Sequence, residues 1–173
     1  MHPGRDLKVL VGGLGLGCTA RAALGSDRVA SVEAVELLPQ VIGWLDRGLV
    51  PLAQELKTDA RFRAVPGDVF KRLSRPPQRR YDLILIDVDH SPEERLGGTS
   101  RSFYTAEGLA LAKGHLEPGG MLGVWSYAES GPFAEALRRA FPEVRVEPVP
   151  FANKSAGTAR TDWLYFGLAQ RAG

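Results

Sequence analysis

The chain alternates strand-like apolar runs with helical patterns from end to end, and this alternation constrains the fold more than any other feature. Five apolar runs each precede a helical pattern: residues 7–12 precede 18–24, 28–36 precede 38–56, 62–65 precede 68–74, 81–87 precede 105–113, and 121–126 precede 132–141. The run YDLILID at residues 81–87 is almost continuously apolar, which is typical of a central parallel strand buried on both faces. The alternation predicts a doubly wound, Rossmann-like α/β sheet with helices on both faces.

Two further strand-like runs, residues 144–149 and 162–168, close the chain with a loop at residues 151–160 between them. Because no helix separates these runs, we expect antiparallel neighbours. The expected sheet therefore has about seven strands, mostly parallel, with the last strand antiparallel. No repeat or long linker divides the sequence, so we expect a single domain over residues 1–173.

Composition narrows the class of protein. A chain of 173 residues, 44% hydrophobic and 24% charged, is long enough to bury a stable core and resembles neither a disordered nor a disulfide-rich protein. The sequence has no apolar run of ~18 residues and no evident signal peptide, so we expect no membrane association. The single cysteine, Cys18, fits a reducing cytoplasm. A net charge of +2 gives little attraction to nucleic acid, which we regard as an unlikely partner.

The most irregular segment is KRLSRPPQRR at residues 71–80, with five basic residues and a double proline. Without these five charges the net charge of +2 would become −3. The segment is either a phosphate-binding arm or a solvated connection into the next strand. The second interpretation is favoured, because no aromatic residues are interleaved for base stacking.

A glycine-rich turn joins the first strand to the first helix, with glycines that include Gly13, Gly15 and Gly17. Glycines let the backbone approach a ligand closely, and the following helix offers free N–H groups to polar ligand atoms. The spacing differs from the dinucleotide fingerprint G-x-G-x-x-G, because the third glycine comes one position early. The turn serves either ligand binding or tight packing.

An acidic residue ends the second strand at Glu36, 19 residues after Gly17. This is where a ribose diol is held by charge-assisted hydrogen bonds in nucleoside-binding sheets. Glu33 is the competing acid, but it falls in mid-strand. The pair of glycine turn and Glu36 predicts a nucleoside-containing cofactor.

Two further acidic segments follow strand ends, where ligands of open α/β sheets bind. Gly67 and Asp68 follow the third strand, and Asp68 either accepts a hydrogen bond from an adenine amine or caps a helix. Asp87 and Asp89 follow the fourth strand and are two residues apart, so they can direct two carboxylates into one pocket. A carboxylate pair suits the binding and deprotonation of a cationic amine. A metal pair with His90 is the less favoured alternative, because no second ligand cluster is evident.

Three other sites have simpler interpretations. His115, in a connection between helix and strand, is expected to be solvated. Trp125 is expected to pack rather than to line a pocket. Phe103 and Tyr104 follow a loop at Gly97 and Gly98 and are candidates to cover the site.

In this order, the segments resemble the spermidine synthase family, the polyamine aminopropyltransferase branch of the class I S-adenosylmethionine-dependent methyltransferase fold. The resemblance spans nearly the whole chain, and the matching stretches are VLVGGLGLG, VEAVELLPQVI, GDVF, YDLILIDVDHSP, FYTAEGLALAKGHLEPGGMLGVWS and TDWLYFGLA. It implies a co-substrate that is S-adenosylmethionine or its decarboxylated form, and a small-molecule amine as the acceptor. It also implies that no metal takes part and that the protein can form a homodimer.

The resemblance also implies roles for individual residues. Glu36 would hold the ribose and Asp68 the adenine amine. The methionine-derived side of the donor would lie against the three glycines of the turn, Gly13, Gly15 and Gly17. Asp87 matches the catalytic aspartate that binds and deprotonates the attacking amine.

The sequence departs from the family pattern at three places. Gly15 stands where the family usually has an aspartate that binds the amine end of decarboxylated S-adenosylmethionine. The family's DSSDP-type segment reads DVDHSP, so the second amine-binding acid is either Asp89 or lost. The sequence starts only a few residues before the first strand, so we expect the family's N-terminal β-rich portion to be lacking.

The function expected first is aminopropyl transfer from decarboxylated S-adenosylmethionine to a diamine such as putrescine. The acids Asp87 and Asp89 favour it. The missing loop acid favours the second alternative, an S-adenosylmethionine-dependent methyltransferase. The expected lack of the N-terminal portion favours a third, a non-catalytic nucleoside-binding homologue, and a nicotinamide oxidoreductase is a distant fourth.

Overall fold

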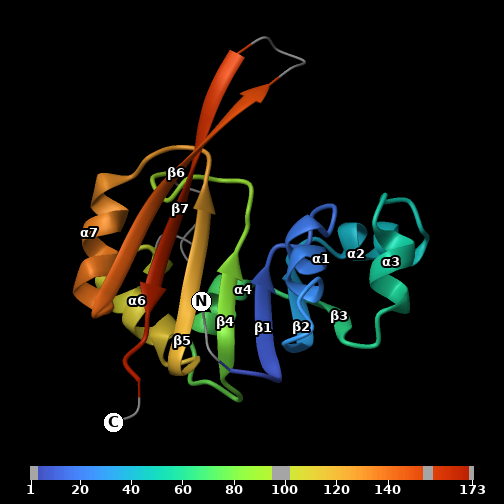
Figure 1. The fold of residues 1–173 in the computed structure, drawn as a ribbon, viewed down its shortest axis with the longest axis horizontal. Coiled ribbons are helices and arrows are strands. Elements are labelled where there is room, and N and C mark those ends of the chain that lie inside the picture. The colour runs from blue at the N-terminus through green and yellow to red at the C-terminus, as the bar shows by residue number, and fades with distance from the viewer. Residues whose placement is uncertain (1–3, 95–101, 154–157, 172–173) are drawn as a thin grey trace.

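A single seven-stranded sheet organises the protein, for which the computed structural model describes residues 4–94, 102–153 and 158–171 (Figure 1). The strands lie in the order β3-β2-β1-β4-β5-β7-β6. β1 to β5 are parallel, and β7 is antiparallel to both of its neighbours. The strands are β1 Leu7–Gly12, β2 Val29–Glu36, β3 Phe62–Pro66, β4 Tyr81–Ile86, β5 Leu116–Ser126, β6 Glu143–Asn153 and β7 Thr158–Leu168. The predicted class, a mostly parallel doubly wound sheet with an antiparallel last strand, is confirmed.

Helices cover both faces of this sheet. They are α1 Cys18–Leu24, α2 Pro39–Asp46, α3 Ala53–Thr58, α4 Val69–Leu73, α6 Ala106–Lys113 and α7 Gly131–Ala140. Val9 and Val11 of β1 belong to the core formed with α1, α2 and α3, whereas Leu10 belongs to the core formed with α4, α6 and α7. Alternate residues of a strand point to opposite faces, so a central strand must be apolar throughout. No helix in the described ranges is long and apolar enough to cross a membrane.

β5 begins five residues earlier than the sequence pattern predicts. Tyr81 of β4 pairs with Leu116 and Leu83 pairs with Met121, so the strand bulges over residues 117–120. This bulge is the expected EPGG turn, and Gly119 adopts φ 76° within it. The Gly119 N–H donates to the Gln170 carbonyl at 3.0 Å, which ties the bulge to the end of the chain and keeps it within the sheet.

The hairpin of β6 and β7 is also longer than predicted, because the ladder continues to the pair Asn153 and Thr158. Its end extends beyond the rest of the sheet as an arm, coloured orange to red at the top of Figure 1. Phe151 and Ala152 are exposed in this arm. Backbone pairing rather than burial holds the arm together, so no alternation of apolar and polar residues marks it in the sequence. β6 forms one edge of the sheet, and β3 forms the other.

The strand order places the carboxyl ends of four parallel strands side by side. Gly12 at the end of β1 pairs with Val35 on one side and Ile86 on the other, and Glu36 pairs with Pro66. After β1 the chain builds the sheet outward through β2 and β3, and then returns to add β4 on the opposite side. Such a reversal of strand order leaves a crevice beyond the strand ends, which is where open α/β sheets bind ligands.

Candidate active site

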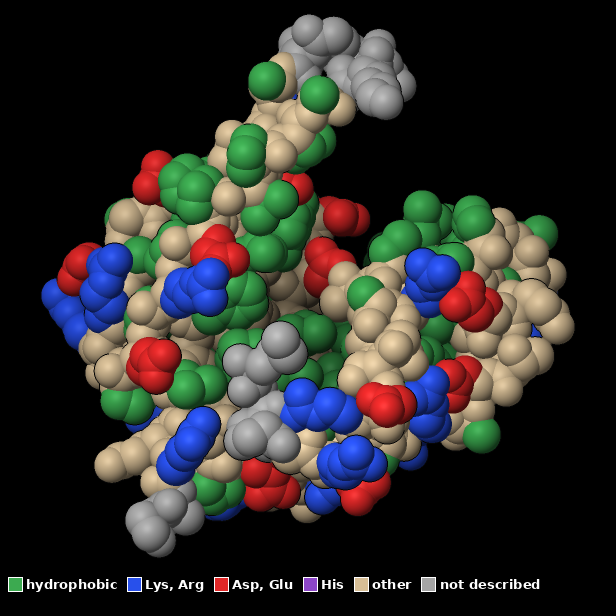
Figure 2. Space-filling model, viewed as in Figure 1, with side chains coloured by type: hydrophobic (Ala, Val, Ile, Leu, Met, Phe, Trp, Pro, Cys, Tyr) green, Lys and Arg blue, Asp and Glu red, His purple; other side chains and the backbone are tan. Residues whose placement is uncertain are grey.

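A cavity of about 480 Å³ lies at these strand ends, and we call it the glycine-loop cleft. Its walls come from the turn after β1, the end of β2, the turn after β3 and the segment after β4. Figure 2 shows the molecule hollowed between the β6–β7 arm and the lobe that holds α1 to α3, with acidic and hydrophobic side chains around the hollow. The size lies within the range of small-molecule sites, ~300–1,000 Å³.

The glycine turn forms one wall and touches the end of β4. Gly13 adopts φ 94°, and a Cβ atom at this position would lie 2.1 Å from the Asp87 carbonyl oxygen. Only glycine allows the turn to pass this close to the next strand. Gly15 also lines the cleft, with φ 49°, and a Cβ atom there would meet nothing within 4 Å. The turn therefore packs against the end of β4 at Gly13, whereas at Gly15 it borders free space in the cleft.

Gly17 is the one predicted cofactor-binding glycine that does not line the cleft. It precedes α1, and a Cβ atom there would lie 2.3 Å from Leu56 Cδ1 of α3. Of the two interpretations of the glycines, ligand contact or tight packing, the structure supports packing at this position. Gly17 contributes to the cleft by letting α1 begin where it does.

Glu36 is buried at the end of β2, 7% exposed, and its carboxylate faces the glycine turn. One oxygen accepts the Leu14 N–H and the other accepts the Leu38 N–H, both at 2.8 Å. Each carboxylate oxygen has two acceptor positions, so both oxygens can still receive a hydroxyl donor from a ligand. The carboxylate fastens two loops together and lies on the wall of the cleft.

Glu33, the competing acid, does not line the glycine-loop cleft. Its carboxylate is 2% exposed and forms ion pairs with Arg63, Arg72 and Arg79. Burial alone would raise the pKa of the Glu33 carboxyl, but the arginines outweigh it and hold the pKa below its usual value. Glu33 and Glu36 are an odd number of residues apart, so their side chains leave β2 on opposite faces.

Asp68 caps α4, and Gly67 and Asp68 both line the cleft. One Asp68 oxygen accepts the Phe70 N–H at 2.9 Å and the Lys71 N–H at 3.0 Å. The helix-capping interpretation is therefore observed. A contact with a bound adenine is compatible with it and stays a prediction.

Asp87 and Asp89 both line the cleft directly after β4. Asp87 is half-buried and Asp89 is exposed. The Asp87 N–H donates to the Gly12 carbonyl at 2.8 Å, and the Thr19 hydroxyl of α1 donates to Asp87 Oδ2. Because Thr19 occupies one carboxylate oxygen, the orientation of the Asp87 side chain is set before any ligand binds.

His90 follows the two aspartates and also lines the cleft, but its side chain is largely buried. It is buried against the rings of Phe70 and Tyr104, with ring centroids 5.8 and 5.9 Å away. This burial lowers the pKa of the imidazole below its ordinary value. In the described part of the chain, no group of three or more His, Cys, Asp or Glu side chains is arranged to hold a metal ion.

Sequence reasoning did not single out Thr19 or Glu94, and it named Tyr127 only as one of three residues at a strand end that could line the pocket, which Tyr127 does not. The Tyr127 hydroxyl at the end of β5 donates to Glu94, whose other oxygen accepts the Ser91 N–H at 3.0 Å. Thr19 had a possible signal, because a hydroxyl in the first turn after a glycine loop can reach the neighbouring strand end. The link between Glu94 and Tyr127 had none, since 33 residues separate the partners.

The remaining predicted residues lie elsewhere. His115 is buried rather than solvated, and its ring donates to the Arg75 carbonyl at 2.9 Å. Trp125 is half-buried, does not line the cleft, and donates to Asp162 at 3.0 Å. Phe103 and Tyr104 belong to the core beneath α6 and do not line the cleft. The loop at Gly97 and Gly98 lies outside the described residues.

The sequence is similar to a polyamine aminopropyltransferase. Polyamine aminopropyltransferase 2 from Streptomyces coelicolor is 32% identical over 146 residues, which are 82% of this chain and 25% of the relative. The chain thus spans about a quarter of the length of this curated relative. No protein-family model matches the chain.

Solved structures share the fold. Spermidine synthase from Thermotoga maritima superposes with a TM-score of 0.73 at 22% identity, over 99% of this chain and 55% of that one, and a spermidine synthase in complex with the transition-state analogue AdoDATO gives the same values. Human methyltransferase-like protein 13 in complex with SAH superposes with a TM-score of 0.68 at 18% identity, over 96% of this chain and 72% of that one. The recognised resemblance and the Rossmann-like methyltransferase fold are confirmed.

Proposed function

We propose that this chain, which resembles the spermidine synthase-like family over most of its length, performs aminopropyl transfer from decarboxylated S-adenosylmethionine to a small amine. One observation carries the proposal. The acids Glu36, Asp68, Asp87 and Asp89, which the motifs assign to the donor and the acceptor, line one cavity together with Gly13 and Gly15. Residues 1–173 would act as one nucleoside-binding and catalytic domain.

In this proposal the donor lies along the carboxyl ends of β1, β2 and β3. The Glu36 carboxylate accepts the two ribose hydroxyls at its remaining acceptor positions, and Asp68, next to Gly67, accepts from the adenine amine. Leu37 and Leu38 line the same end of the cleft and are 65% and 54% exposed, so a bound adenine ring would cover apolar surface there. The methionine-derived side then extends toward the glycine turn.

Asp87 is the proposed base. An alkyl amine with a pKa near that of lysine is only about 0.04% neutral at pH 7, so the attacking nitrogen needs a proton acceptor. Asp87 takes a proton from the ammonium group, and the freed nitrogen lone pair attacks the carbon attached to the sulfonium. The C–N bond forms as the C–S bond breaks, and the electron pair stays on sulfur as a neutral thioether. Asp89 holds the acceptor amine as a second carboxylate.

The chain's contribution to the rate is mainly alignment. Displacement at a sulfonium carbon needs no covalent intermediate, and positioning of two reactants supplies up to ~7–11 kcal/mol of such a barrier. The hydrogen bond from Thr19 fixes one Asp87 oxygen, which leaves the other directed at the acceptor. The glycine turn, held in place by Glu36, forms the adjacent wall.

A second candidate function is methyl transfer from intact S-adenosylmethionine. Gly15 favours it, because the position that carries an acid in the family has only open space around its Cβ direction. Without that acid the turn neither attracts the aminopropyl ammonium group nor repels the carboxylate of the intact donor.

Calorimetry with the two donors separates these candidates. We expect binding of decarboxylated S-adenosylmethionine to be tighter than that of the intact form, and mass spectrometry should find spermidine after incubation with putrescine. Clear preference for the intact donor would instead support the methyltransferase. Failure of both donors to bind would support a non-catalytic homologue.

The family resemblance also favours a homodimer, and the single cysteine favours the cytoplasm. Sedimentation of the purified chain tests the first of these two proposals, because a monomer at micromolar concentration would contradict it. Fractionation of cells tests the second.

A further inference from the structure

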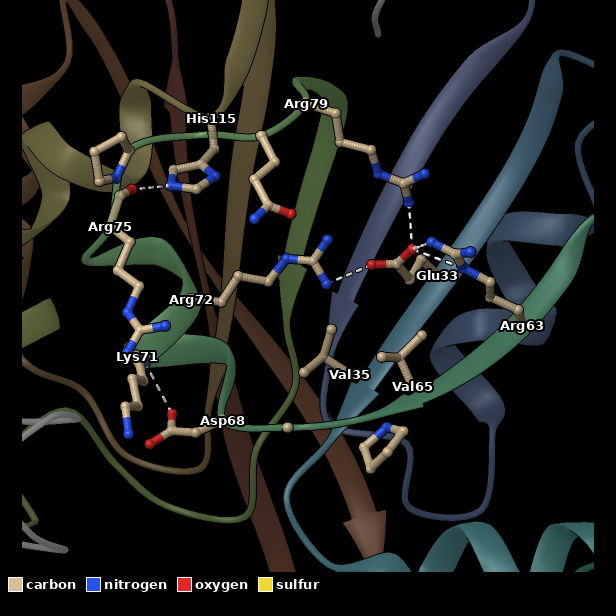
Figure 3. Close-up of a pocket in the computed structure, with 14 residues that line it drawn as sticks. Glu33, Val35, Arg63, Val65, Asp68, Lys71, Arg72, Arg75, Arg79 and His115 are labelled. Atoms are coloured by element: carbon tan, nitrogen blue, oxygen red, sulfur yellow. Dashed lines mark hydrogen bonds and ion pairs between the residues drawn. The ribbon is translucent and has the colours of Figure 1, made fainter.

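A second cavity, of about 660 Å³, lies over β2 and β3 on the face that carries α4, and we call it the basic cavity. Val35 and Val65 supply apolar contacts from the strands (Figure 3), and Pro66 adds a third. α4 has five residues and spans only ~7.5 Å, so it leaves part of these strands uncovered. Five cationic side chains surround the opening: Arg63, Lys71, Arg72, Arg75 and Arg79.

Three of these cations converge on one carboxylate. Arg63 from β3, Arg72 from α4 and Arg79 from the approach to β4 all pair with Glu33, as Figure 3 shows. A single carboxylate balances one of three guanidinium charges, so the cluster carries an excess of two positive charges. The Glu33 carboxylate is 2% exposed, whereas the three arginine side chains are 62%, 30% and 41% exposed. The acid is buried and the cations remain accessible from the cavity.

Lys71 and Arg75 form the opposite wall, where Figure 3 shows their side chains beside Asp68 and apart from the Glu33 cluster. Both residues are exposed, and in the ranges that the structure describes neither of their side chains forms an ion pair. Five cations and two acids, Glu33 and Asp68, line the basic cavity, so its lining carries a net charge of about +3. Burial lowers the pKa of His115, also in the wall, so we do not count it among the cations.

We propose that the basic cavity binds an oligophosphate, either free or as the di- or triphosphate of a nucleotide. Guanidinium groups present a planar fork of donors that matches phosphate oxygens in pairs, and a triphosphate carries enough negative charge to balance the excess. Val35, Val65 and Pro66 provide an apolar surface for an attached base. The inference uses none of the residues proposed for the chemical step, Asp87 and Asp89, although the cavity borders the glycine-loop cleft at Val35, Gly67 and Asp68.

The structure adds a role to the basic segment at residues 71–80. Three of its cations, Lys71, Arg72 and Arg75, line the cavity from α4 and the turn that follows it, and Arg79 lines it from the approach to β4. Sequence spacing alone cannot reveal that Arg63 and Glu33 join them from neighbouring strands. Residues 74–80 are exposed and lead into β4, as the favoured interpretation of a solvated connection predicts, and four cations of the segment also line the cavity.

Isothermal titration with tripolyphosphate tests the proposal, with sulfate as the comparison anion at the same ionic strength. We expect one site per chain and an affinity at least tenfold higher than for sulfate. The double variant K71A/R75A should lose at least tenfold in tripolyphosphate affinity. The matched control R47A/K57A removes one Arg and one Lys from exposed positions on the α2–α3 lobe and should bind as the parent does.

Two outcomes would overturn the proposal. Equal affinities for tripolyphosphate and sulfate would mean nonspecific attraction, and an unchanged affinity of K71A/R75A would place the anion elsewhere. Titration with uridine triphosphate distinguishes the two sources of the ligand. Tighter binding than tripolyphosphate indicates a nucleotide whose base packs on Val35 and Val65, and equal binding indicates free oligophosphate. Uridine avoids binding through adenine recognition, so a failed aminopropyltransferase proposal would leave this result unaffected.

Discussion

Glu33 and Glu36 lie three residues apart on β2, and each belongs to a different cavity. Glu36 accepts two backbone N–H groups and faces the glycine-loop cleft, whereas Glu33 accepts three guanidinium groups and faces the basic cavity. Neutral backbone donors leave the Glu36 charge available to a ligand. The arginines more than cancel the Glu33 charge, so that side of the sheet attracts anions. β2 thus supplies one acid to each cavity, and the surroundings of the two acids differ in charge.

The largest effect is expected for Asp87, the proposed proton acceptor in the glycine-loop cleft. Asp87→Asn removes the proton acceptor but keeps the shape of the side chain, so turnover should fall by about a thousandfold while donor affinity stays within twofold. Mass spectrometry of the product and calorimetry with the donor measure the two quantities. Asp27→Asn, at an exposed position, is the control. Turnover close to the parent's would rule out Asp87 as the base.

Glu33→Gln tests the opposite face of β2. The change leaves three guanidinium groups without their carboxylate, and we expect a loss of about 2 kcal/mol in the free energy of unfolding, a value reduced because the arginines are partly exposed. Tripolyphosphate should bind more tightly, since one negative charge is lost from the basic cavity. Urea unfolding and titration measure both effects. A loss of donor affinity in this variant would contradict the separation of the two cavities.

Glu36→Gln makes the same change at the acid of the glycine-loop cleft. The amide retains an acceptor for one backbone N–H but loses the charge, so donor affinity should fall about tenfold, which corresponds to about 1.4 kcal/mol. Calorimetry measures the affinity, and tripolyphosphate binding serves as the internal control. The two variants should therefore differ in donor binding, which falls in Glu36→Gln and is unchanged in Glu33→Gln.

Gly15→Asp tests whether the glycine turn sets the choice of donor. The φ of 49° is one that Asp tolerates better than most residues, and a Cβ atom there meets nothing within 4 Å. The new carboxylate should favour the decarboxylated donor over the intact one by about threefold to tenfold. Competition calorimetry measures this ratio. Gly15→Asn has a similar size without the charge and should leave the ratio unchanged.

The smallest effect is the pH dependence of stability that we expect from His90, beside the glycine-loop cleft, and His115, beside the basic cavity. Burial lowers the pKa of both His90 and His115 below the ordinary value of 6.5, so the folded state stays neutral where the unfolded chain takes up protons. The free energy of unfolding should be highest above about pH 6.5 and should decline gradually as the pH falls below this value. The lowered pKa of Glu33 affects stability only at more acidic pH, below about 4.5. Melting temperatures between pH 7.5 and 5.5 measure the decline, which His115→Gln should make shallower.

The parts of the structure that the sequence predicts well depend on local pattern. β1 and α1 have the expected bounds, and Glu36 and Asp87 occupy one cavity, because the ends of parallel strands meet at one edge of a sheet. The parts that escaped prediction depend on contacts between distant residues. Arg63 and Arg79 lie 30 and 46 residues from Glu33, and the buried His115 donates to a carbonyl 40 residues away. No spacing rule connects such residues before the fold is known.

The edge strand β6 has a consequence for how copies of the molecule meet. Pro148 and Pro150 lie on the same side of this strand, two residues apart, and proline has no N–H to donate. Prolines in an edge strand prevent another chain from adding a strand to the sheet. The arm therefore resists edge-to-edge polymerisation, which is the usual hazard of a long exposed hairpin, and we expect copies of this chain not to pair through the β6 edge.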